Sequence, residues 1–323
     1  MADREEKTGK NDNGKKNKGG KRNKIVAIEM IILVLLIMAA AVIFIQKDKS
    51  VKEAAKIHDQ KTKKTEQTTP ATQKDNEIEE ETEDTDEETG DRDEAVPDRS
   101  NFAVQPGVSV GTTEQSDEKI VYLTLDDGPS DNTQAVLDIL DKYNAKATFF
   151  VTGEMPEYKD MIKAAYDKGH TIGMHTYSHD YAKVYASVDA YFQDLDQIGQ
   201  MVQEEIGYVP CFIRFPGGSS NTVSKKYTAG IMSTLVQEVQ NRGYQYYDWN
   251  GSSGDGSVRT TEELVAQATS FDSNNIILLC HDSHGKQTTV EALPQIIEHY
   301  QSLGYTFKAL DRDSFVAHHG VNN

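Results

Sequence analysis

The sequence predicts an α/β fold, a closed or nearly closed (β/α) barrel, over residues 118–323. Apolar runs typical of strands alternate with helical patterns there, giving about seven strand–helix units in about 200 residues. No glycine-rich phosphate loop follows the first apolar run, which argues against an open dinucleotide-binding sheet. In barrels of this kind the functional side chains lie where the strands end.

The expected strands and helices alternate along the chain. After the first apolar run, Val136, Ile139, Leu140 and Tyr143 recur at helical spacing, and Gly169 stops the next helical pattern. The expected strands cover residues 120–123, 147–151, 170–174, 209–215, 243–249, 276–280 and 306–310. The expected helices cover residues 132–143, 160–168, 188–206, 226–242, 261–271 and 290–303.

The N-terminal part of the chain predicts a membrane anchor. Residues 1–24 are polar and basic, and residues 25–45 are apolar apart from Glu29. At about 1.5 Å per residue the apolar run spans the ~30 Å hydrocarbon core of a bilayer, so we expect one transmembrane helix. The positive-inside rule places the basic tail in the cytoplasm and the rest of the chain outside the cell membrane. Alanines at 39–41 leave a cleaved signal peptide as the alternative, although the apolar run is long for one.

Residues 46–117 are expected to form a disordered, charged linker. This stretch is rich in Lys, Thr and Gln and then in Asp and Glu, with few aliphatic residues. Such a segment cannot bury enough apolar surface to repay its ordering entropy. The chain has a formal net charge of −18, and the acidic part of the linker would be repelled by the phosphates of nucleic acid. This argues against nucleic acid as a partner.

Two cysteines, Cys211 and Cys280, both fall in the expected compact domain. An extracellular compartment permits a disulfide between them. Buried free thiols fit the sequence at least as well, so both alternatives stay open.

Two adjacent carboxylates, Asp126 and Asp127, follow the first expected strand and precede Gly128-Pro129, a turn signal. Neighbouring strand residues point to opposite faces, so both carboxylates can serve one site only where the backbone turns. An ordinary turn that closes a strand is the alternative for an isolated match.

Two histidines, His175 and His179, follow the end of a later strand. On a helical turn this spacing of four residues brings both imidazoles to one face, which suits a metal ion. A carboxylate and two histidines are a sufficient ligand set for catalytic zinc with an open position for water. A pair of surface histidines is the alternative.

Further polar clusters end three later strands. Arg214 ends one of these strands and precedes Pro216-Gly217-Gly218. An arginine at this position can hold a carboxylate by an ion pair, and the glycines allow backbone N–H groups to approach a substrate oxygen. The other two clusters are Asp248-Trp249 and Leu279-Cys280-His281-Asp282. Five clusters at strand ends predict one site more strongly than any of them does alone.

In their order these five clusters resemble the motifs of the polysaccharide deacetylase family, which is carbohydrate esterase family 4 or the NodB-homology domain. The resemblance covers about residues 119–310. It implies a distorted (β/α)7-type barrel and a hydrolase that removes acetyl groups with a divalent metal, usually Zn²⁺, with Co²⁺ or Ni²⁺ as alternatives.

The resemblance also implies roles for the matching residues. Asp126 is implied as the general base, with Arg214 orienting it. The implied metal ligands are Asp127, His175 and His179.

For the remaining motif residues, the resemblance implies that the Gly217 N–H contributes to the oxyanion hole. His281 is implied as the general acid, tuned by Asp248. Substrate contacts are implied for Pro216, Trp249 and Leu279.

Four positions depart from the commoner residues of the family. Leu125, Met174, Gly217 and Gln245 stand where Phe, Asn, Tyr and an additional Asp are frequent. None of these departures removes a catalytic atom, but Gly217 opens the rim of the site and leaves the choice of substrate open. His170 matches no motif and is expected to be structural.

The expected function is removal of N-acetyl groups from a cell-surface aminosugar polymer, which releases acetate and a free amine. Peptidoglycan N-acetylglucosamine is the first choice, because an anchor and a linker hold the domain against the wall. An O-acetyl esterase acting on xylan or a wall polysaccharide is one alternative. A non-catalytic glycan-binding surface protein is another, although a binder needs neither base nor acid. The oligomeric state stays open.

Overall fold

The computed structural model describes residue 99 and residues 101–322. The expected basic tail, the expected transmembrane helix and most of the expected linker lie outside the described residues. Within the described part, no helix has the length and apolar character needed to cross a bilayer.

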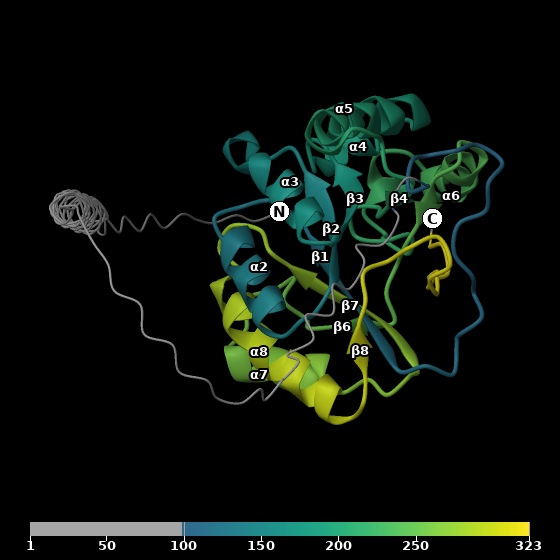
Figure 1. Cartoon of the computed structure of the whole chain (residues 1–323). Coiled ribbons are helices and arrows are strands. Elements are labelled where there is room, and N and C mark those ends of the chain that lie inside the picture. Colours follow the sequence, from purple (N-terminus) through teal and green to yellow (C-terminus); the bar gives the residue numbers. More distant parts are fainter. Residues whose placement is uncertain (1–98, 100, 323) are drawn as a thin grey trace, which may run out of the picture. The chain divides into compact units, whose positions relative to one another are not determined.

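The centre of the domain is a curved, eight-stranded sheet in which all the paired strands are parallel (Figure 1). The strands are β1 (Ile120–Asp126), β2 (Ala147–Thr152), β3 (Thr171–Thr176), β4 (Phe212–Ile213), β5 (Gln245–Tyr246), β6 (Gly251–Ser252), β7 (Asn275–His281) and β8 (Thr306–Phe307). Their order is β5-β4-β3-β2-β1-β7-β6, and β8 pairs with the start of β1. Since β5 and β6 do not pair in the described chain, the barrel is nearly closed rather than closed.

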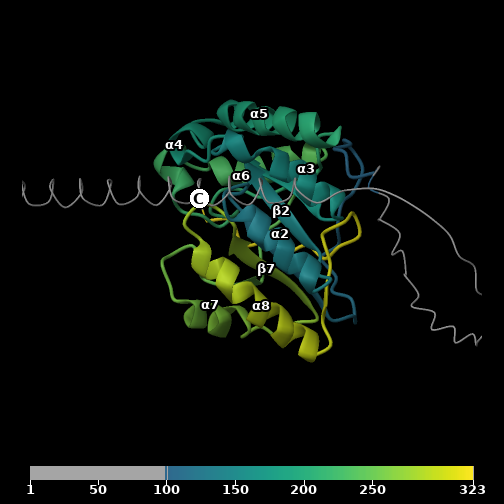
Figure 2. The same ribbon diagram turned by 60° about the vertical axis from the view of Figure 1, so that its left-hand side comes forward.

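Helices cover the outer face of this sheet (Figures 1 and 2). They are α2 (Thr133–Lys142), α3 (Asp160–Asp167), α4 (Tyr181–Val184), α5 (Val188–Ile206), α6 (Ile231–Asn241), α7 (Thr261–Ala268) and α8 (Gln287–Ser302), with short 3₁₀ turns at Pro156–Tyr158 and Ser224–Lys226. Neighbouring helices contact one another in the order α7, α8, α2, α3, α5, α6.

Every expected helix and strand has a counterpart, but several bounds differ. The helix expected over 226–242 begins only at Ile231, because Gly230 before it is left-handed, with φ 77°. The strands expected over 209–215, 243–249 and 306–310 shorten to two residues each. No sequence pattern predicts α4 or β6, since a four-residue helix and a two-residue strand are too short to show a period.

The strands divide the apolar residues into two cores. In β1, Val121, Leu123 and Leu125 pack into the core between the sheet and the helices. Ile120 and Tyr122 point the other way, into a smaller core inside the curved sheet. By the two-residue period of a strand, Thr124 and Asp126 follow them onto this inner face. The inner face therefore changes from apolar to polar toward the carboxyl ends of the strands.

The segment 101–117, which the sequence placed in the linker, belongs to the compact domain. Phe102 is buried and its ring lies edge-on to Phe212, with the ring centroids 5.1 Å apart. The Val104 N–H donates to the Val209 carbonyl oxygen at 2.9 Å, and Val110 is buried in the inner core. The boundary at residue 118 is therefore wrong. It was missed because isolated apolar residues in an irregular segment have no period.

The two cysteines are free thiols, which excludes the disulfide alternative. Cys280 belongs to the core under the helices and Cys211 to the core inside the sheet.

His170 has the structural role that the sequence indicated. It is fully buried just before β3, and its Nδ1 accepts a hydrogen bond from the Ala147 N–H at 3.2 Å. Its Nε2 has no hydrogen-bond partner among the described residues. Burial, together with the nearby positive charge of Lys146, lowers the pKa of His170 to about 3.

The low pKa of His170 makes stability depend on pH. An unfolded histidine binds a proton below about pH 6.5, whereas native His170 does not until about pH 3. The free energy of unfolding should therefore fall by about 1.4 kcal/mol per pH unit as the pH drops below 6.5. In urea titrations with metal removed, wild type should lose about 2 kcal/mol more than His170→Gln between pH 6.5 and 5. His284→Gln, at an exposed position, should behave as wild type. Equal pH slopes in wild type and His170→Gln would contradict the assignment.

Candidate active site

The polar strand ends that the sequence singled out meet at the carboxyl edge of the inner face. Asp126 ends β1 and His281 ends β7, and the two residues are direct neighbours in the parallel register. His175 lies in β3, and Arg214 follows β4, with its N–H donating to the Met174 carbonyl oxygen at 3.0 Å. The expectation that these polar side chains gather at the strand ends is therefore confirmed.

Asp127, His175 and His179 form a cluster with the geometry of a metal site. Asp127 Oδ1 lies 3.4 Å from Nε2 of His175 and 3.4 Å from Nε2 of His179. One ligand atom from each residue lies within 4.8 Å of the others. The turn that the sequence required after Asp126 is present, because Asp127 is left-handed, with φ 68°.

The expected helical turn between the two histidines is wrong. His175 belongs to the strand β3, and His179 lies in the loop after it, in left-handed backbone with φ 46°. Asp194 of α5 holds this loop by accepting hydrogen bonds from the Tyr177 N–H at 2.6 Å and from the Ser178 hydroxyl at 2.5 Å. Sequence reasoning missed Asp194, which looks like any other polar residue of an amphipathic helix.

The donor set fits a divalent cation. His175 Nδ1 donates to the Arg214 carbonyl oxygen at 2.7 Å, which leaves Nε2 unprotonated on the side of Asp127. Asp127 Oδ1 is buried and has no hydrogen-bond partner in the described part of the chain. Burial opposes its ionisation, but positive charge on neighbouring groups, His281 and Lys286 among them, holds the pKa of Asp127 below its usual value. A carboxylate with an unpaired oxygen facing two imidazole nitrogens is a suitable site for a transition metal.

Asp126 is held by a buried ion pair with Arg214. Arg214 Nη1 lies 2.7 Å from Asp126 Oδ1, and the two residues are 0% and 3% exposed. The same guanidinium donates to Thr124 Oγ1 at 2.7 Å and to the Tyr247 carbonyl oxygen at 2.8 Å. It also lies over the ring of Phe150, 4.4 Å from its centroid. These contacts leave the Asp126 carboxylate little freedom to rotate.

The carboxylate that pairs with His281 is Asp255, so the predicted pairing with Asp248 is wrong. Asp255 Oδ1 lies 2.8 Å from His281 Nδ1, and Oδ2 accepts from the His281 N–H at 2.8 Å. Thr289 Oγ1 donates to Oδ2 at 2.8 Å, and Asp255 is 2% exposed. Burial disfavours the charged imidazole, but the hydrogen bond and charge of Asp255 raise the pKa of His281 to about 9.

Sequence reasoning missed Asp255 because it follows the two-residue strand β6, which has no pattern of its own. The glycines on both sides, Gly254 and Gly256, were the only local signal of a special turn.

Asp248 instead joins the loop after β4 to the C-terminal tail. Its Oδ1 accepts from the Ser219 N–H at 2.8 Å, and its Oδ2 accepts from the Ser219 hydroxyl and from the His319 N–H. His319 Nε2 in turn donates to the Trp249 carbonyl oxygen at 2.6 Å. Asp248 is thus fully buried, and its hydrogen bonds stabilise the loop that contains Gly217.

The expected substrate-contacting residues lie in this loop, against it, or in β7. Gly218 has φ 76°, and a Cβ on it would lie 2.9 Å from the Trp249 ring, so the ring packs directly on the backbone. Leu279 lies on the same face of β7 as His281 and belongs to neither apolar core. The Pro216 carbonyl oxygen accepts from the Tyr185 hydroxyl at 2.8 Å.

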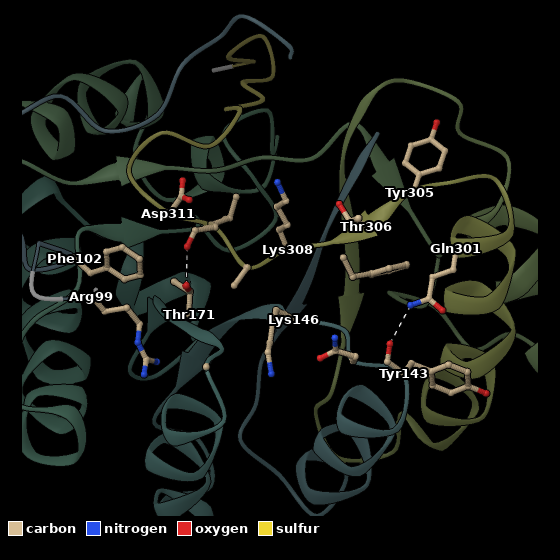
Figure 3. A pocket seen from close by; sticks show the side chains of 15 residues that line it. Arg99, Phe102, Tyr143, Lys146, Thr171, Gln301, Tyr305, Thr306, Lys308 and Asp311 are labelled. Atoms are coloured by element: carbon tan, nitrogen blue, oxygen red, sulfur yellow. Dashed lines mark hydrogen bonds between the residues drawn. The ribbon is translucent and has the colours of Figure 1, made fainter. Parts of the chain in front are cut away.

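A cavity of about 380 Å³ adjoins the metal-ligand cluster and is lined by Asp127, Glu154, Met155, Ser283 and His284. A larger one, of about 480 Å³, lies where strands begin, beside Lys146, Thr171 and Lys308 (Figure 3). Because it is at the amino ends of the strands, it is remote from Asp126, His175 and His281, so the smaller cavity is the one beside the candidate chemistry.

The adjacent carboxylates should differ in their effect on metal binding. Asp127→Ala removes a ligand and should weaken Zn²⁺ affinity at least about 100-fold, beyond the 10–100-fold typical of losing a supporting partner. Asp126→Asn replaces the carboxylate with an amide of the same shape beside Arg214 and removes no metal ligand. It should leave the Zn²⁺ affinity within a few-fold of wild type. Competition with a chromophoric chelator measures both. Equal loss in the two variants would contradict this division.

Comparison with known proteins agrees with the geometry. The sequence profile of a family described as polysaccharide deacetylase matches residues 113–236. The Bacillus subtilis protein YheN is 30% identical over 217 residues, which are 64% of this chain and 72% of that protein. A peptidoglycan-N-acetylglucosamine deacetylase of Bacillus cereus is 29% identical over 226 residues, 65% of this chain and 78% of that protein.

Among solved structures, the catalytic domain of the peptidoglycan N-acetylglucosamine deacetylase from Eubacterium rectale superimposes with a TM-score of 0.63. It is 45% identical in sequence, and the match covers 67% of this chain and 98% of that one. The fold, the strand-end site and these similarities lead to one conclusion: the chain belongs to the polysaccharide deacetylase family.

Proposed function

We propose that this chain removes N-acetyl groups from the N-acetylglucosamine of peptidoglycan. The observation that carries the chemistry is that a candidate base and a candidate acid, neighbours in the sheet, both lie next to one metal-ligand cluster. Asp126 precedes the ligand Asp127 in the chain, and His281 Nε2 lies 3.9 Å from Asp127 Oδ2. The choice of sugar is supported by the names of the relatives from Bacillus cereus and Eubacterium rectale.

The metal in this proposal is Zn²⁺, held by Asp127, His175 and His179. When bound, it supplies a Lewis acid that lowers the pKa of water and polarises a carbonyl group. Asp126, fixed by Arg214, accepts the proton of the attacking water. The Gly217 N–H donates to the acyl oxygen as this oxygen gains negative charge. In the described chain this N–H has no acceptor of its own.

His281 completes the reaction by giving its proton to the nitrogen of the sugar. The new bond joins the water oxygen to the acyl carbon, the carbon–nitrogen bond breaks, and acetate and a free amine leave. An amine is a poor leaving group unless protonated, so the acid has to carry its proton at working pH. Asp255 supports this by raising the pKa of His281 to about 9.

The location in this proposal is the outer face of the cell membrane. The support is the apolar run of residues 25–45 with basic residues before it. An anchor followed by a linker keeps the domain close to the wall, where its polymer is.

Acetate release decides the reaction. Purified full-length protein with Zn²⁺ should release acetate from peptidoglycan faster than from chitooligosaccharide or acetylated xylan. Asp126→Asn should lower the rate by about 100- to 10,000-fold, the range of a general base. Absence of acetate from every N-acetylated glycan, with Asp126→Asn indistinguishable from wild type, would refute the proposal. Faster release from xylan esters would make the chain an O-acetyl esterase.

Variants of Asp255 and Asp248 test which of these two carboxylates pairs with His281. Asp255→Asn should lower kcat by about 100-fold. It should also move the alkaline limb of the pH–kcat/KM profile to lower pH, because His281 without the carboxylate loses its proton more readily. Asp248→Asn should lower the unfolding temperature but leave that limb in place. A shifted limb in Asp248→Asn alone would restore the pairing first expected from the sequence.

A further inference from the structure

Tyr181 lies beside the candidate site and matches none of the motifs. It is the first residue of α4, two positions after His179, and it is partly buried. Its ring is edge-on to that of His179, with centroids 5.7 Å apart, and packs against Tyr185 at 5.6 Å. The side chain is therefore fixed between a metal-ligand candidate and its own helix.

The hydroxyl of Tyr181 is next to the backbone of Gly217. Gly217 has φ 74°, and a Cβ added to it would lie 2.7 Å from Tyr181 Oη. The Tyr185 hydroxyl donates to the Pro216 carbonyl oxygen at 2.8 Å and so ties α4 to the same loop. The Tyr181 hydroxyl therefore lies close to the Gly217 backbone, and Tyr185, the residue that follows α4, holds the helix at this loop.

Neither group is used within the protein. Among residues 101–322 and Arg99, no hydrogen-bond partner exists for the Tyr181 hydroxyl or for the Gly217 N–H. The hydroxyls of Tyr185 and Tyr300 donate to carbonyl oxygens. Those of Tyr191 and Tyr247 also lack a partner among the described residues, but they are buried in the apolar cores, whereas Tyr181 lies beside the metal-ligand cluster. A phenol keeps its proton at neutral pH and can donate it to an acceptor. Two unused donors side by side at a metal-ligand cluster are arranged for an oxygen of the substrate.

We propose that Tyr181 is a second donor for the acyl oxygen of the substrate, acting with the Gly217 N–H. This inference rests on the proposed deacetylase function. The hydroxyl keeps its proton and forms no covalent bond. Its hydrogen bond strengthens as the acyl oxygen becomes an oxyanion, so the interaction contributes more to the transition state than to substrate binding.

Tyr181→Phe in the full-length protein should lower kcat for acetate release by about 100-fold, the size typical of one oxyanion donor, and leave KM within about twofold. Metal content and unfolding temperature should stay at wild-type values. Tyr227→Phe makes the same change at an exposed tyrosine, 45% accessible, and should keep full activity. An unchanged kcat, or a raised KM with unchanged kcat, would overturn the proposal.

Acetate binding tests Tyr181 without turnover. An acetate oxygen can occupy the place of the acyl oxygen, so Tyr181→Phe loaded with Zn²⁺ should bind acetate about tenfold more weakly in a calorimetric titration, consistent with loss of a hydrogen bond to a charged group. Equal affinity for wild type and variant would overturn the role of Tyr181. If the wild-type protein bound acetate but released no acetate from any glycan, the proposed deacetylase function would fail. The acetate titration would still decide whether Tyr181 donates to a bound oxygen.

A double-mutant cycle locates the hydroxyl. Gly217→Ala places a methyl group against Tyr181 Oη and is also strained by its positive φ. Removing the hydroxyl relieves the contact but not the strain. The drop in unfolding temperature caused by Gly217→Ala should therefore be smaller in Tyr181→Phe than in wild type. Additive effects would show that the hydroxyl does not lie against Gly217, which would overturn the proposal.

Discussion

The ion pair between Arg214 and Asp126 is the interaction on which the arrangement of the site depends. In the sheet, β4 and β1 are separated by β3 and β2. Arg214 follows β4 but bonds to Thr124 and Asp126 of β1, so its side chain crosses the inside of the curved sheet. It also bonds to the Tyr247 carbonyl oxygen after β5. Because both charges are buried, loss of either partner leaves an unpaired charge, at a cost of about 3–5 kcal/mol. The Arg214 side chain thus connects distant strands across the curved sheet and holds the candidate base Asp126 in place.

Buried aspartates that take no part in the proposed chemistry hold the loops around this pair. Asp194 fixes the loop before His179, and Asp248 fixes the loop after Gly217. Asp282 accepts from the Thr133 hydroxyl at 2.6 Å and so anchors the start of α2, just after the loop of Asp127. Left-handed backbone at Asp127 and His179 costs of order 1–3 kcal/mol each and persists only where the surroundings fix it. The hydrogen bonds of these buried aspartates hold the surrounding loops in place.

The sequence predicted the parts of the fold and site that depend on local pattern. The buried strands β1, β2, β3 and β7 and the amphipathic helices have clear periods, and parallel topology brings their polar ends together. This placed Asp126, His175 and His281 correctly. The failures concern contacts between distant segments. Asp255 reaches His281 across 26 residues of sequence, whereas the role of Asp248 was implied only by the family resemblance. The packing of residues 101–117 depends in the same way on partners such as Phe212 and Arg312, far along the chain.

The two thiols bear on how the domain can assemble. Cys211 and Cys280 lie in separate cores, and burial raises the pKa of Cys211 to about 11 and that of Cys280 well above its usual value. Thiolates are the reactive species in exchange with oxidants and other thiols. Both sulfur atoms are therefore chemically inert near neutral pH. The domain needs neither an oxidising environment nor a disulfide-forming catalyst to reach its native state, and the same structure is compatible with reducing and oxidising surroundings.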